Sequence, residues 1–291
     1  MRISDAASYQ RLLDNLNMLN SRLETATEQV SSGRRLNHLH DGPSAAAEMV
    51  QLNGQLAQID QFQTNADQSN YLLQFSDSVL TSVYDLVTAI FTRGSEAASS
   101  LADEQSRAIL AVEIRSQRDQ ILSLANTDVQ GRFLFAGSQS ASPAFSLSGD
   151  TAQYHGDNVI NTVDINNGLS VNGNIPGSTA FQRVFETVEQ LLAAIDAGDE
   201  TAIRSSLSGF AGALSDVNKV RAALGVDLAK IENSSLARQM QQTSITARQA
   251  NLSNADMAQA VTDLTQAQTA LQASLTAGSM IHRYNLFDFL V

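Results

Sequence analysis

The sequence contains no cysteine, and this absence removes several classes of protein. Without thiols the chain forms no disulfide, and it offers neither a cysteine nucleophile nor ligands for a cysteine-based zinc site or an iron–sulfur cluster. Tryptophan is also absent, and aromatic residues make up 5% of the 291 residues although hydrophobic residues make up 43%. We therefore do not expect a compact core rich in aromatic side chains.

Long apolar runs are missing as well. No run of 18 or more apolar residues exists, so the sequence predicts no transmembrane helix. Asp5, Gln10 and Asp14 interrupt the N-terminal segment, which argues against a cleaved signal peptide. The net charge of -12 and a pI of about 4.6 argue against a general affinity for nucleic acid or for an anionic membrane. Neither is expected as a partner.

Proline is scarce, and its three positions indicate where regular structure starts or stops. Pro43 precedes a run of Ser and Ala and predicts the first turn of a helix. Pro143 and Pro176 bracket a segment with strand-like alternation over 159–165 and the turn pairs Asn167-Gly168 and Asn172-Gly173. No Lys or Arg occurs between residues 138 and 182. The pattern predicts a β-rich insert of distinct composition, preceded by a short Phe-Leu-Phe strand over 133–135.

Outside this insert the chain shows helical periodicity. Near the N-terminus, apolar residues recur at alternating spacings of three and four, as in the seam of a coiled coil. The stripe consists of Tyr9, Leu12, Leu16, Leu19, Leu23, Ala26 and Val30. A second seam predicts one long helix over 43–93, ending near Gly94. Gln63, Asn70 and Asp77 fall in that seam, and we interpret them as polar layers that fix register rather than as catalytic groups.

Further helices are expected over 95–125, over 181–195 with Gly198 at its end, and over 201–250. The acidic pairs Asp103-Glu104 and Asp199-Glu200 are typical of helix starts. A C-terminal stripe matches the N-terminal one and consists of Met257, Val261, Leu264, Leu271, Leu275, Ile281, Leu286 and Phe289. Because each stripe is too narrow to be stable alone in water, we expect the two ends to pair with each other or with neighbouring subunits. These two stripes are the candidate assembly interface.

Candidate catalytic groups are few. His38 and His40 stand together, but no third ligand follows at metal spacing, and no phosphate-binding loop or nucleophile motif occurs. The two histidines are expected to face solvent or a neighbouring chain. We expect no catalytic residue, no metal, no cofactor and no enzymatic activity.

Two motifs at opposite ends resemble the bacterial flagellins and flagellin-like axial proteins. Residues 28–37, EQVSSGRRLN, are similar to the amino-terminal signature of that family. Residues 254–262, 268–274 and 285–290 are similar to its carboxyl signature. Within the family, the start MRIS, the run DGPSAA over 41–46 and the segment ANTDVQGRFLFAG over 125–137 most resemble the members at the junction of hook and filament. The loop residues Asp41-Gly42 and the pair Arg283-Tyr284 depart from the family pattern.

The resemblance implies a mainly α fold: a long antiparallel coiled-coil or helical-bundle rod built from both chain ends, with a small β-rich central insert. It implies a terminal coiled-coil domain of 1–40 with 255–291, a helical rod domain of 41–137 with 182–254, and an outer domain of 138–181. The implied role is a structural adaptor at the hook–filament junction of the bacterial flagellum. Such a protein is exported by the flagellar type III route and is extracellular.

The expected partners are further copies of the chain in a ring or helical assembly, a neighbouring hook-associated protein, flagellin, and an export chaperone that binds near the C-terminus. One alternative is a small flagellin that forms the filament itself. A second is a coiled-coil secreted translocator or signalling fragment, which would not explain the two terminal signatures.

Overall fold

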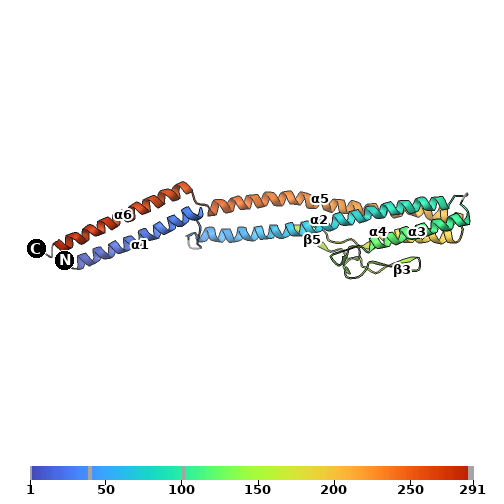
Figure 1. Cartoon of the computed structure of the whole chain (residues 1–291), viewed down its shortest axis with the longest axis horizontal. Helices are drawn as coiled ribbons and strands as arrows, with labels where there is room; N and C mark the ends of the chain where they lie inside the picture. Colours follow the sequence, from blue (N-terminus) through green and yellow to red (C-terminus); the bar gives the residue numbers. More distant parts are fainter. Residues whose placement is uncertain (1, 39–40, 100–101, 288–291) are drawn as a thin grey trace. The chain divides into compact units, whose positions relative to one another are not determined.

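The computed structural model describes residues 2–38, 41–99 and 102–287, with the side chains of 2–6, 8 and 281–287 excepted. The chain divides into two compact units, Met1–Ala57 with Gln241–Val291, and Gln58–Met240. The described residues form six helices: α1 (Arg2–Ser32), α2 (Pro43–Ala97), α3 (Glu104–Ala125), α4 (Gly177–Asp196), α5 (Glu200–Ser253) and α6 (Met257–Phe287) (Figure 1). The predicted fold class, mainly helical with a small β insert, is confirmed.

The two longest helices, α2 and α5, contain 55 and 54 residues. At about 1.5 Å per residue each is roughly 80 Å long. Pro43 is the first residue of α2, as predicted. The predicted end near Gly94 is wrong, because α2 continues to Ala97. A Cβ atom at Gly94 would lie 2.8 Å from Cδ2 of both Leu191 and Leu207, so this glycine allows α4 and α5 to approach α2 closely.

The third helix begins later than predicted. We expected a helix from residue 95, whereas α2 ends at Ala97 and α3 starts at Glu104. Asp103 caps α3, and its Oδ1 accepts a hydrogen bond of 2.7 Å from the backbone N–H of Ser106. Asp199 Oδ1 accepts in the same way from Ala202, 3.0 Å away, before α5. Both acidic pairs therefore mark helix starts, as expected.

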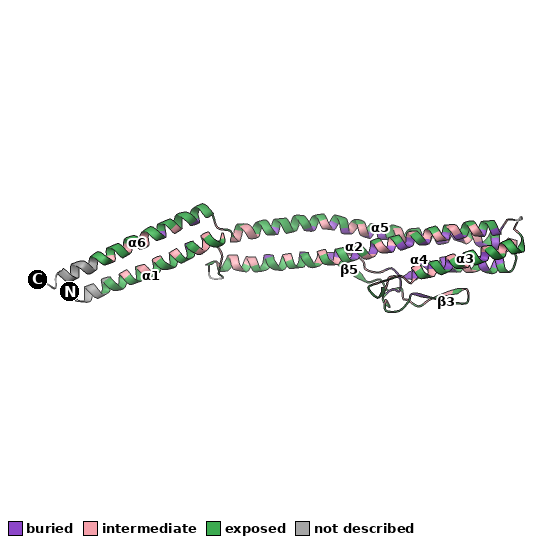
Figure 2. Ribbon diagram, in the orientation of Figure 1, coloured by how far each residue is buried: buried purple, intermediate pink, exposed green. Residues whose placement is uncertain are grey.

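Residues 58–240 form a bundle in which α2, α3, α4 and α5 share one apolar core. Figure 2 shows the buried side of these ribbons. Small aliphatic side chains fill much of it, including Val83, Val87, Ile90, Ile114, Ile121, Val188, Leu191, Ala213 and Val217. The core as a whole is not rich in aromatic side chains, but five of them, Phe135, Phe145, Tyr154, Phe181 and Phe185, form one cluster. Phe181 packs edge-on against Phe135, with ring centroids 4.8 Å apart, and Phe145 lies 5.1 Å from Phe185.

The insert consists of three separate antiparallel hairpins rather than one sheet. They are β1 (Asp128–Val129) with β2 (Arg132–Phe133), β3 (Phe145–Ser148) with β4 (Thr151–Tyr154), and β5 (Thr162–Asn166) with β6 (Leu169–Asn172). The turn pair Asn167-Gly168 joins β5 and β6, and Gly168 has the expected positive φ of 72°. Asn172-Gly173 is not a turn of a hairpin, because β6 ends there.

The predicted Phe-Leu-Phe strand is shorter than expected. Only Phe133 belongs to β2, while Phe135 is fully buried against α4. The chain leaves the strand because the side chain of Phe135 packs into the aromatic cluster, and an aromatic side chain of this size gains more from burial than from one further ladder pair.

Polar residues of the α2 seam hold α5 in register. Gln63 Oε1 accepts a hydrogen bond of 3.2 Å from Arg238 Nε, and Asp77 Oδ1 accepts one of 2.9 Å from Arg221 Nε. Asn70, the third polar position, bonds within α2 to Gln74. A polar layer of this kind penalises a shifted register, since a shift would leave the buried Arg238 and the partly buried Asp77 and Arg221 without these partners.

Arg238 also connects the helices to the β insert. Its side chain is 1% exposed, and Nη1 donates to the backbone oxygen of Ile165 at 2.5 Å and to Ser234 Oγ at 2.8 Å. Burial lowers the pKa of the Arg238 guanidinium from its usual value. The hairpin of β5 and β6 is therefore fixed to α5 by a buried cation.

Candidate assembly interface

Helices α1 and α6 pack against each other along a heptad seam. On α6 the seam contains the buried or half-buried residues Ala260, Leu264, Ala267, Leu271, Ser274 and Gly278. On α1 the seam contains Leu12, Leu16, Leu19, Leu23, Ala26 and Val30, which are likewise buried or half-buried. Both sets follow spacings of three and four, the pattern with which two helices interlock. The candidate residues Leu264 and Leu271 and all of the N-terminal candidates except Tyr9 thus lie on the α1–α6 seam.

Other candidate residues lie outside that seam. Tyr9 is 59% exposed, and Met257, Val261 and Leu275 are between 45% and 55% exposed. At about 100° per residue, these three α6 residues fall within about 40° of one another, so they form an apolar stripe beside the seam. The side chains of Ile281 and Leu286 lie outside the described part of the structure, as does Phe289 altogether.

Sequence reasoning missed three further exposed apolar residues among the described side chains of α1 and α6. Leu13 is 38% exposed, Met18 is 49% exposed and Met280 is 56% exposed. Each lies next to or near a seam residue, and a search restricted to one heptad stripe passes over them. Three small residues, Ala26, Ala260 and Ala267, are the only seam positions of α1 and α6 that are fully buried among the described side chains. Two helices alone therefore leave much apolar surface uncovered.

The segments that carry the two terminal signatures meet in space. Arg34 and Asn254 form an antiparallel β-bridge. The N–H of Arg35 donates to the oxygen of Ser253 at 2.7 Å, and the N–H of Ala255 donates to the oxygen of Gly33 at 3.0 Å. Gly33 ends α1 with a φ of +68°, a conformation that glycine adopts without strain. Backbone bonds thus join the end of α1 to the start of α6.

The loop after α1 is ordered by Asp41. Its Oδ2 accepts hydrogen bonds from the backbone N–H groups of Asn37, at 3.0 Å, and His38, at 2.7 Å. His38 Nε2 lies 3.3 Å from Glu28 Oε1 of α1, and His40 lies outside the described residues. Within the ranges that the structure describes, no group of three or more His, Cys, Asp or Glu side chains is placed to hold a metal ion.

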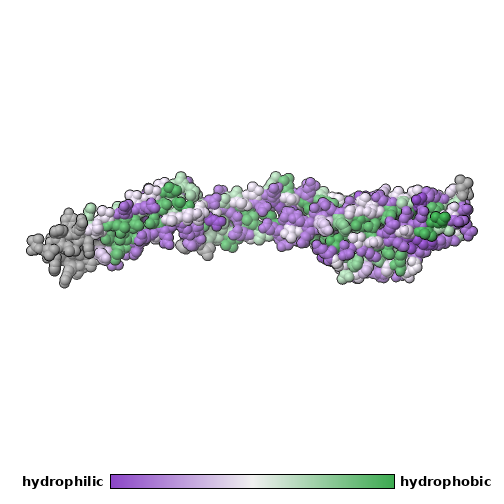
Figure 3. All heavy atoms as spheres, in the orientation of Figure 1, coloured by the Kyte–Doolittle hydropathy of each residue, from purple (hydrophilic) through white to green (hydrophobic). Residues whose placement is uncertain are grey.

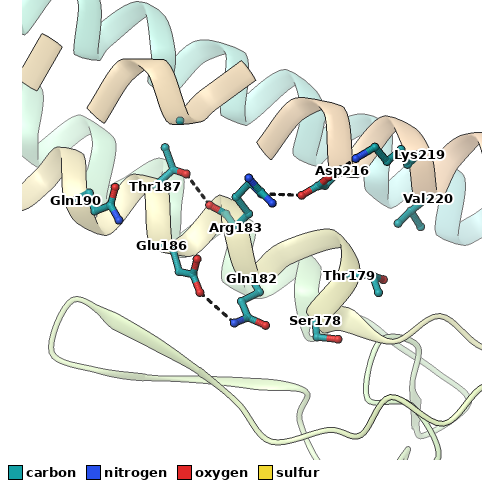
Figure 4. Close-up of a pocket in the computed structure, with 11 residues that line it drawn as sticks. Ser178, Thr179, Gln182, Arg183, Glu186, Thr187, Gln190, Asp216, Lys219 and Val220 are labelled. Atoms are coloured by element: carbon teal, nitrogen blue, oxygen red, sulfur yellow. Dashed lines mark hydrogen bonds and ion pairs between the residues drawn. The ribbon is translucent and has the colours of Figure 1, made fainter. Parts of the chain in front are cut away.

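A groove of about 690 Å³ lies between α4 and α5, and its polar groups are shown in Figure 4. Asp216 is its central acid: Oδ2 lies 2.7 Å from Arg183 Nε and Oδ1 lies 2.8 Å from Lys219 Nζ. The hydrogen bond from Lys219, followed by the charge of Arg183, keeps the pKa of Asp216 below its usual value. The acid is ionised and neutralised, and among the groove residues no nucleophile stands next to a general base. The arrangement clamps α4 to α5.

No helix in the described part of the chain combines the length and the apolar character that crossing a membrane requires.

Two family models match the chain. The model of the bacterial flagellin N-terminal helical region matches residues 3–140, and that of the C-terminal helical region matches residues 207–290. The chain belongs to the bacterial flagellin family. The matched regions of this flagellin-family chain include α1, α2 and α3 on one side and most of α5 with α6 on the other. The resemblance of the terminal signatures is thereby confirmed.

Relatives of known name extend over nearly the whole chain. Flagellar hook-associated protein 3 of Escherichia coli is 26% identical over 99% of both chains. The flagellar filament 30.7 kDa core protein of Treponema maltophilum is 22% identical over 89% of this chain and 88% of its own. The crystal structure of the flagellar junction protein FlgL from Legionella pneumophila superimposes with a TM-score of 0.60 at 15% identity, covering 71% of this chain and 99% of that one. The last similarity shows a shared fold.

Proposed function

We propose that this chain is the structural adaptor at the junction of hook and filament in a bacterial flagellum. One observation carries the proposal: the hook-associated protein 3 of Escherichia coli aligns with it over 99% of both chains. The alignment leaves no domain of either protein unmatched. The filament core protein of Treponema, by comparison, covers 89% of the chain, and a small flagellin is the second candidate.

The surface of α1 and α6 supports assembly through the chain ends. Tyr9 and Leu275 are more than half exposed, and Met257 and Val261 nearly so. Fully burying a side chain of this size stabilises an assembly by about 1.5–3 kcal/mol. Contact between copies would cover the stripe that a single pair of helices leaves open. The terminal stripes therefore pack α1 against α6 within the chain and also provide apolar surface for contact between copies.

The proposed division of labour follows the three parts expected from the sequence. Residues 1–40 with 255–291 form the inner assembly domain, 41–137 with 182–254 the helical body, and 138–181 the outer part. The partners are further copies of the chain, a neighbouring hook-associated protein and flagellin, with an export chaperone near the C-terminus before assembly. The assembled protein is extracellular, on the flagellum.

The proposed role is mechanical rather than catalytic. The relatives bear the names of structural flagellar proteins. The charged groups in the α4–α5 groove neutralise one another, as Asp216 with Arg183 and Lys219 shows.

Location decides between the two candidates. The full chain carrying a fluorescent label on an exposed residue of the β insert is expressed in flagellated cells that lack their own copy. A single band between hook and filament is expected. Label spread along the whole filament would instead establish the flagellin alternative, and label absent from flagella would contradict both.

A further inference from the structure

The chain contains three asparagine–glycine pairs, and the structure holds each of them in a different backbone environment. They are Asn53-Gly54 within α2, Asn167-Gly168 between β5 and β6, and Asn172-Gly173 at the end of β6. Such a pair is chemically labile, because glycine has no side chain to hinder the approach of its backbone nitrogen to the side-chain carbonyl carbon of the asparagine. Since the reacting groups are the same in all three pairs, the fold decides which of them reacts.

The reaction, deamidation, needs no enzyme, and water is its only co-reactant. The glycine nitrogen loses its proton and forms a bond to Cγ of the asparagine, while the Cγ–Nδ2 bond breaks and ammonia leaves with that proton. Water then opens the five-membered imide at either carbonyl and leaves an aspartate or an isoaspartate. No electron is transferred, and the chain gains one negative charge for each pair that reacts.

The turn between β5 and β6 leaves Asn167-Gly168 open to this reaction. Both residues are exposed, and a Cβ atom at Gly168 would meet nothing within 4 Å. Among the turn and loop hydrogen bonds between backbone groups of the described residues, none is donated by the Gly168 N–H. On the face that Figure 3 shows, hydrophilic and hydrophobic side chains mix over the surface of the β insert. The glycine nitrogen can therefore lose its proton to water without breaking a hydrogen bond.

The pair in α2 is restrained by the helix. Gly54 lies more than two turns inside α2, so its N–H donates within the helical ladder. The side chain of Asn53 is also engaged, because its Oδ1 accepts a hydrogen bond of 2.8 Å from Gln249 Nε2. The Cα–C bond of the asparagine becomes part of the imide ring, and closing the ring would rotate this bond out of its helical conformation. Asn53 therefore reacts only when α2 opens locally.

The pair at the end of β6 is restrained by its contacts. The Gly173 N–H donates to the oxygen of Asn161 at 2.7 Å, and the Asn172 N–H donates to Asp227 Oδ2 of α5 at 3.3 Å. A Cβ atom at Gly173 would lie 2.9 Å from Val163 Cγ2, so the space beside this glycine is filled. Attack by the Gly173 nitrogen would break its hydrogen bond and move a packed segment.

We infer that Asn167 is a site of spontaneous deamidation in the folded protein, and that the fold protects Asn53 and Asn172. The reaction places a carboxylate in the turn of a hairpin, within a segment that contains no Lys or Arg. The hairpin stays attached to α5, because Arg238 donates to the oxygen of Ile165 in the strand and not to the turn. The modified fraction therefore grows with the age of each folded molecule. The inference does not depend on the proposed function.

Mass spectrometry of aged protein tests the inference. The purified full chain is kept at slightly alkaline pH, and samples taken over several weeks are digested and analysed for the exchange of NH2 for OH at each pair. Asn167 is expected to react at least about tenfold faster than Asn53 and Asn172, a difference in activation free energy of about 1.4 kcal/mol. Equal rates at the three asparagines, or no reaction at Asn167, would overturn the inference.

The same chain in guanidinium chloride separates the effect of the fold from that of the sequence. Without the turn, the helix and the strand contacts, the rates at the three pairs are expected to become similar. A preference for Asn167 that persists in the unfolded chain would come from its neighbours in sequence, and it would contradict the protection that we assign to the fold.

Two glutamine variants supply a second readout, the more acidic form that anion-exchange chromatography separates. Glutamine reacts much more slowly, because its attack would close a six-membered ring. Asn167→Gln is expected to lose most of the acidic form, whereas Asn53→Gln, the matched control at another exposed asparagine, should produce it as fast as the unaltered chain. Circular dichroism checks that both variants remain folded. Equal formation of the acidic form in the two variants would refute the site.

Discussion

Leu12 of α1 lies directly against Gly278 of α6, so closely that a Cβ atom at residue 278 would stand 3.1 Å from Leu12 Cδ2. The glycine is a hole in the α6 seam into which the leucine of the opposing helix fits. The two residues are almost the full length of the chain apart in sequence. Their contact shows that the ends pair in an antiparallel sense, in agreement with the bridge between Arg34 and Asn254.

Filling that hole should disrupt assembly. Gly278→Leu is expected to push Leu12 out of the seam and to reduce incorporation into flagella, measured by swimming in soft agar and by immunoblots of sheared flagella. Gly54→Leu is the matched control, because Gly54 lies within α2 and a Cβ atom there meets nothing within 4 Å. Leucine is a better helix former than glycine by up to about 1 kcal/mol, so the control should be neutral or stabilising. Equal swimming by the two variants would contradict the fit of Leu12 and Gly278.

A charge in the seam should act in the same way. Leu264 is half-buried on the face of α6 that meets α1, whereas Thr265, the next residue, is exposed. Leu264→Asp is expected to remove more than about 1 kcal/mol of packing, since full burial of a leucine is worth about 1.5–3 kcal/mol, and to block incorporation. Thr265→Asp adds the same charge one residue away and should leave incorporation intact. Leu271→Asp is expected to resemble Leu264→Asp. Normal motility of both seam variants would refute the role of this stripe.

Arg238 offers a test of how the bundle holds its β insert. Arg238→Ala is expected to lower the free energy of unfolding by about 2–5 kcal/mol, the range found when a large buried side chain is truncated. It also leaves the oxygen of Ile165 and the side chain of Gln63 without the bonds that they now accept. Arg238→Met keeps most of the volume and removes a buried cation, so it should cost less than the alanine variant. Urea unfolding followed by circular dichroism measures both, and an equal loss would show that volume is not the deciding factor.

Acid should loosen the hairpin of β3 and β4. Asp150 lies in the turn between β3 and β4 and accepts a hydrogen bond from Arg118 of α3. This bond keeps the pKa of the Asp150 carboxyl below its usual value of 3.8. A carboxyl with a lowered pKa stabilises the folded state above its unfolded pKa, and this contribution disappears as the pH falls through the folded pKa. The contribution should therefore be complete above about pH 5 and should fade below about pH 4.

The matching variant is Asp150→Asn. Its melting temperature should lie below that of the unaltered protein at neutral pH, and the two should converge as the pH falls below 4. Asp119→Asn is the control, because Asp119 is the more exposed partner of Arg118, 58% against 42% for Asp150. Melting curves that stay parallel for Asp150→Asn at every pH would show that the ion pair contributes nothing to stability.

Much of this fold can be predicted from the sequence because interactions between residues close in sequence determine it. The heptad positions from Leu12 to Val30, the proline that opens α2 and the capping acids Asp103 and Asp199 each act through neighbours within one or two turns. Gly94 shows where such rules fail. From its neighbours in sequence alone, Gly94 is expected to end a helix. In the bundle its missing side chain instead lets α4 and α5 approach α2, and this depends on tertiary packing.

The interface residues divide in the same way. A single stripe describes the contact of α1 with α6 well, since Leu16, Leu23 and Leu264 all fall on it. The stripe does not separate residues that pack within the chain from those such as Val261 and Leu275 that face outward. Two faces of one helix share the same period, and the sequence alone does not say which face meets which neighbour.

The backbone pairing of Gly33, Arg34 and Arg35 with residues 253–255 also governs the order of events. A polypeptide that is synthesised from its N-terminus cannot make these bonds until about nine-tenths of it has appeared. Closing so long a loop costs conformational entropy, which the packing of α1 against α6 offsets. A chain cut short before residue 253 has every residue of α1 and none of the partner strand. Such a chain therefore keeps α1 but cannot form this backbone pairing.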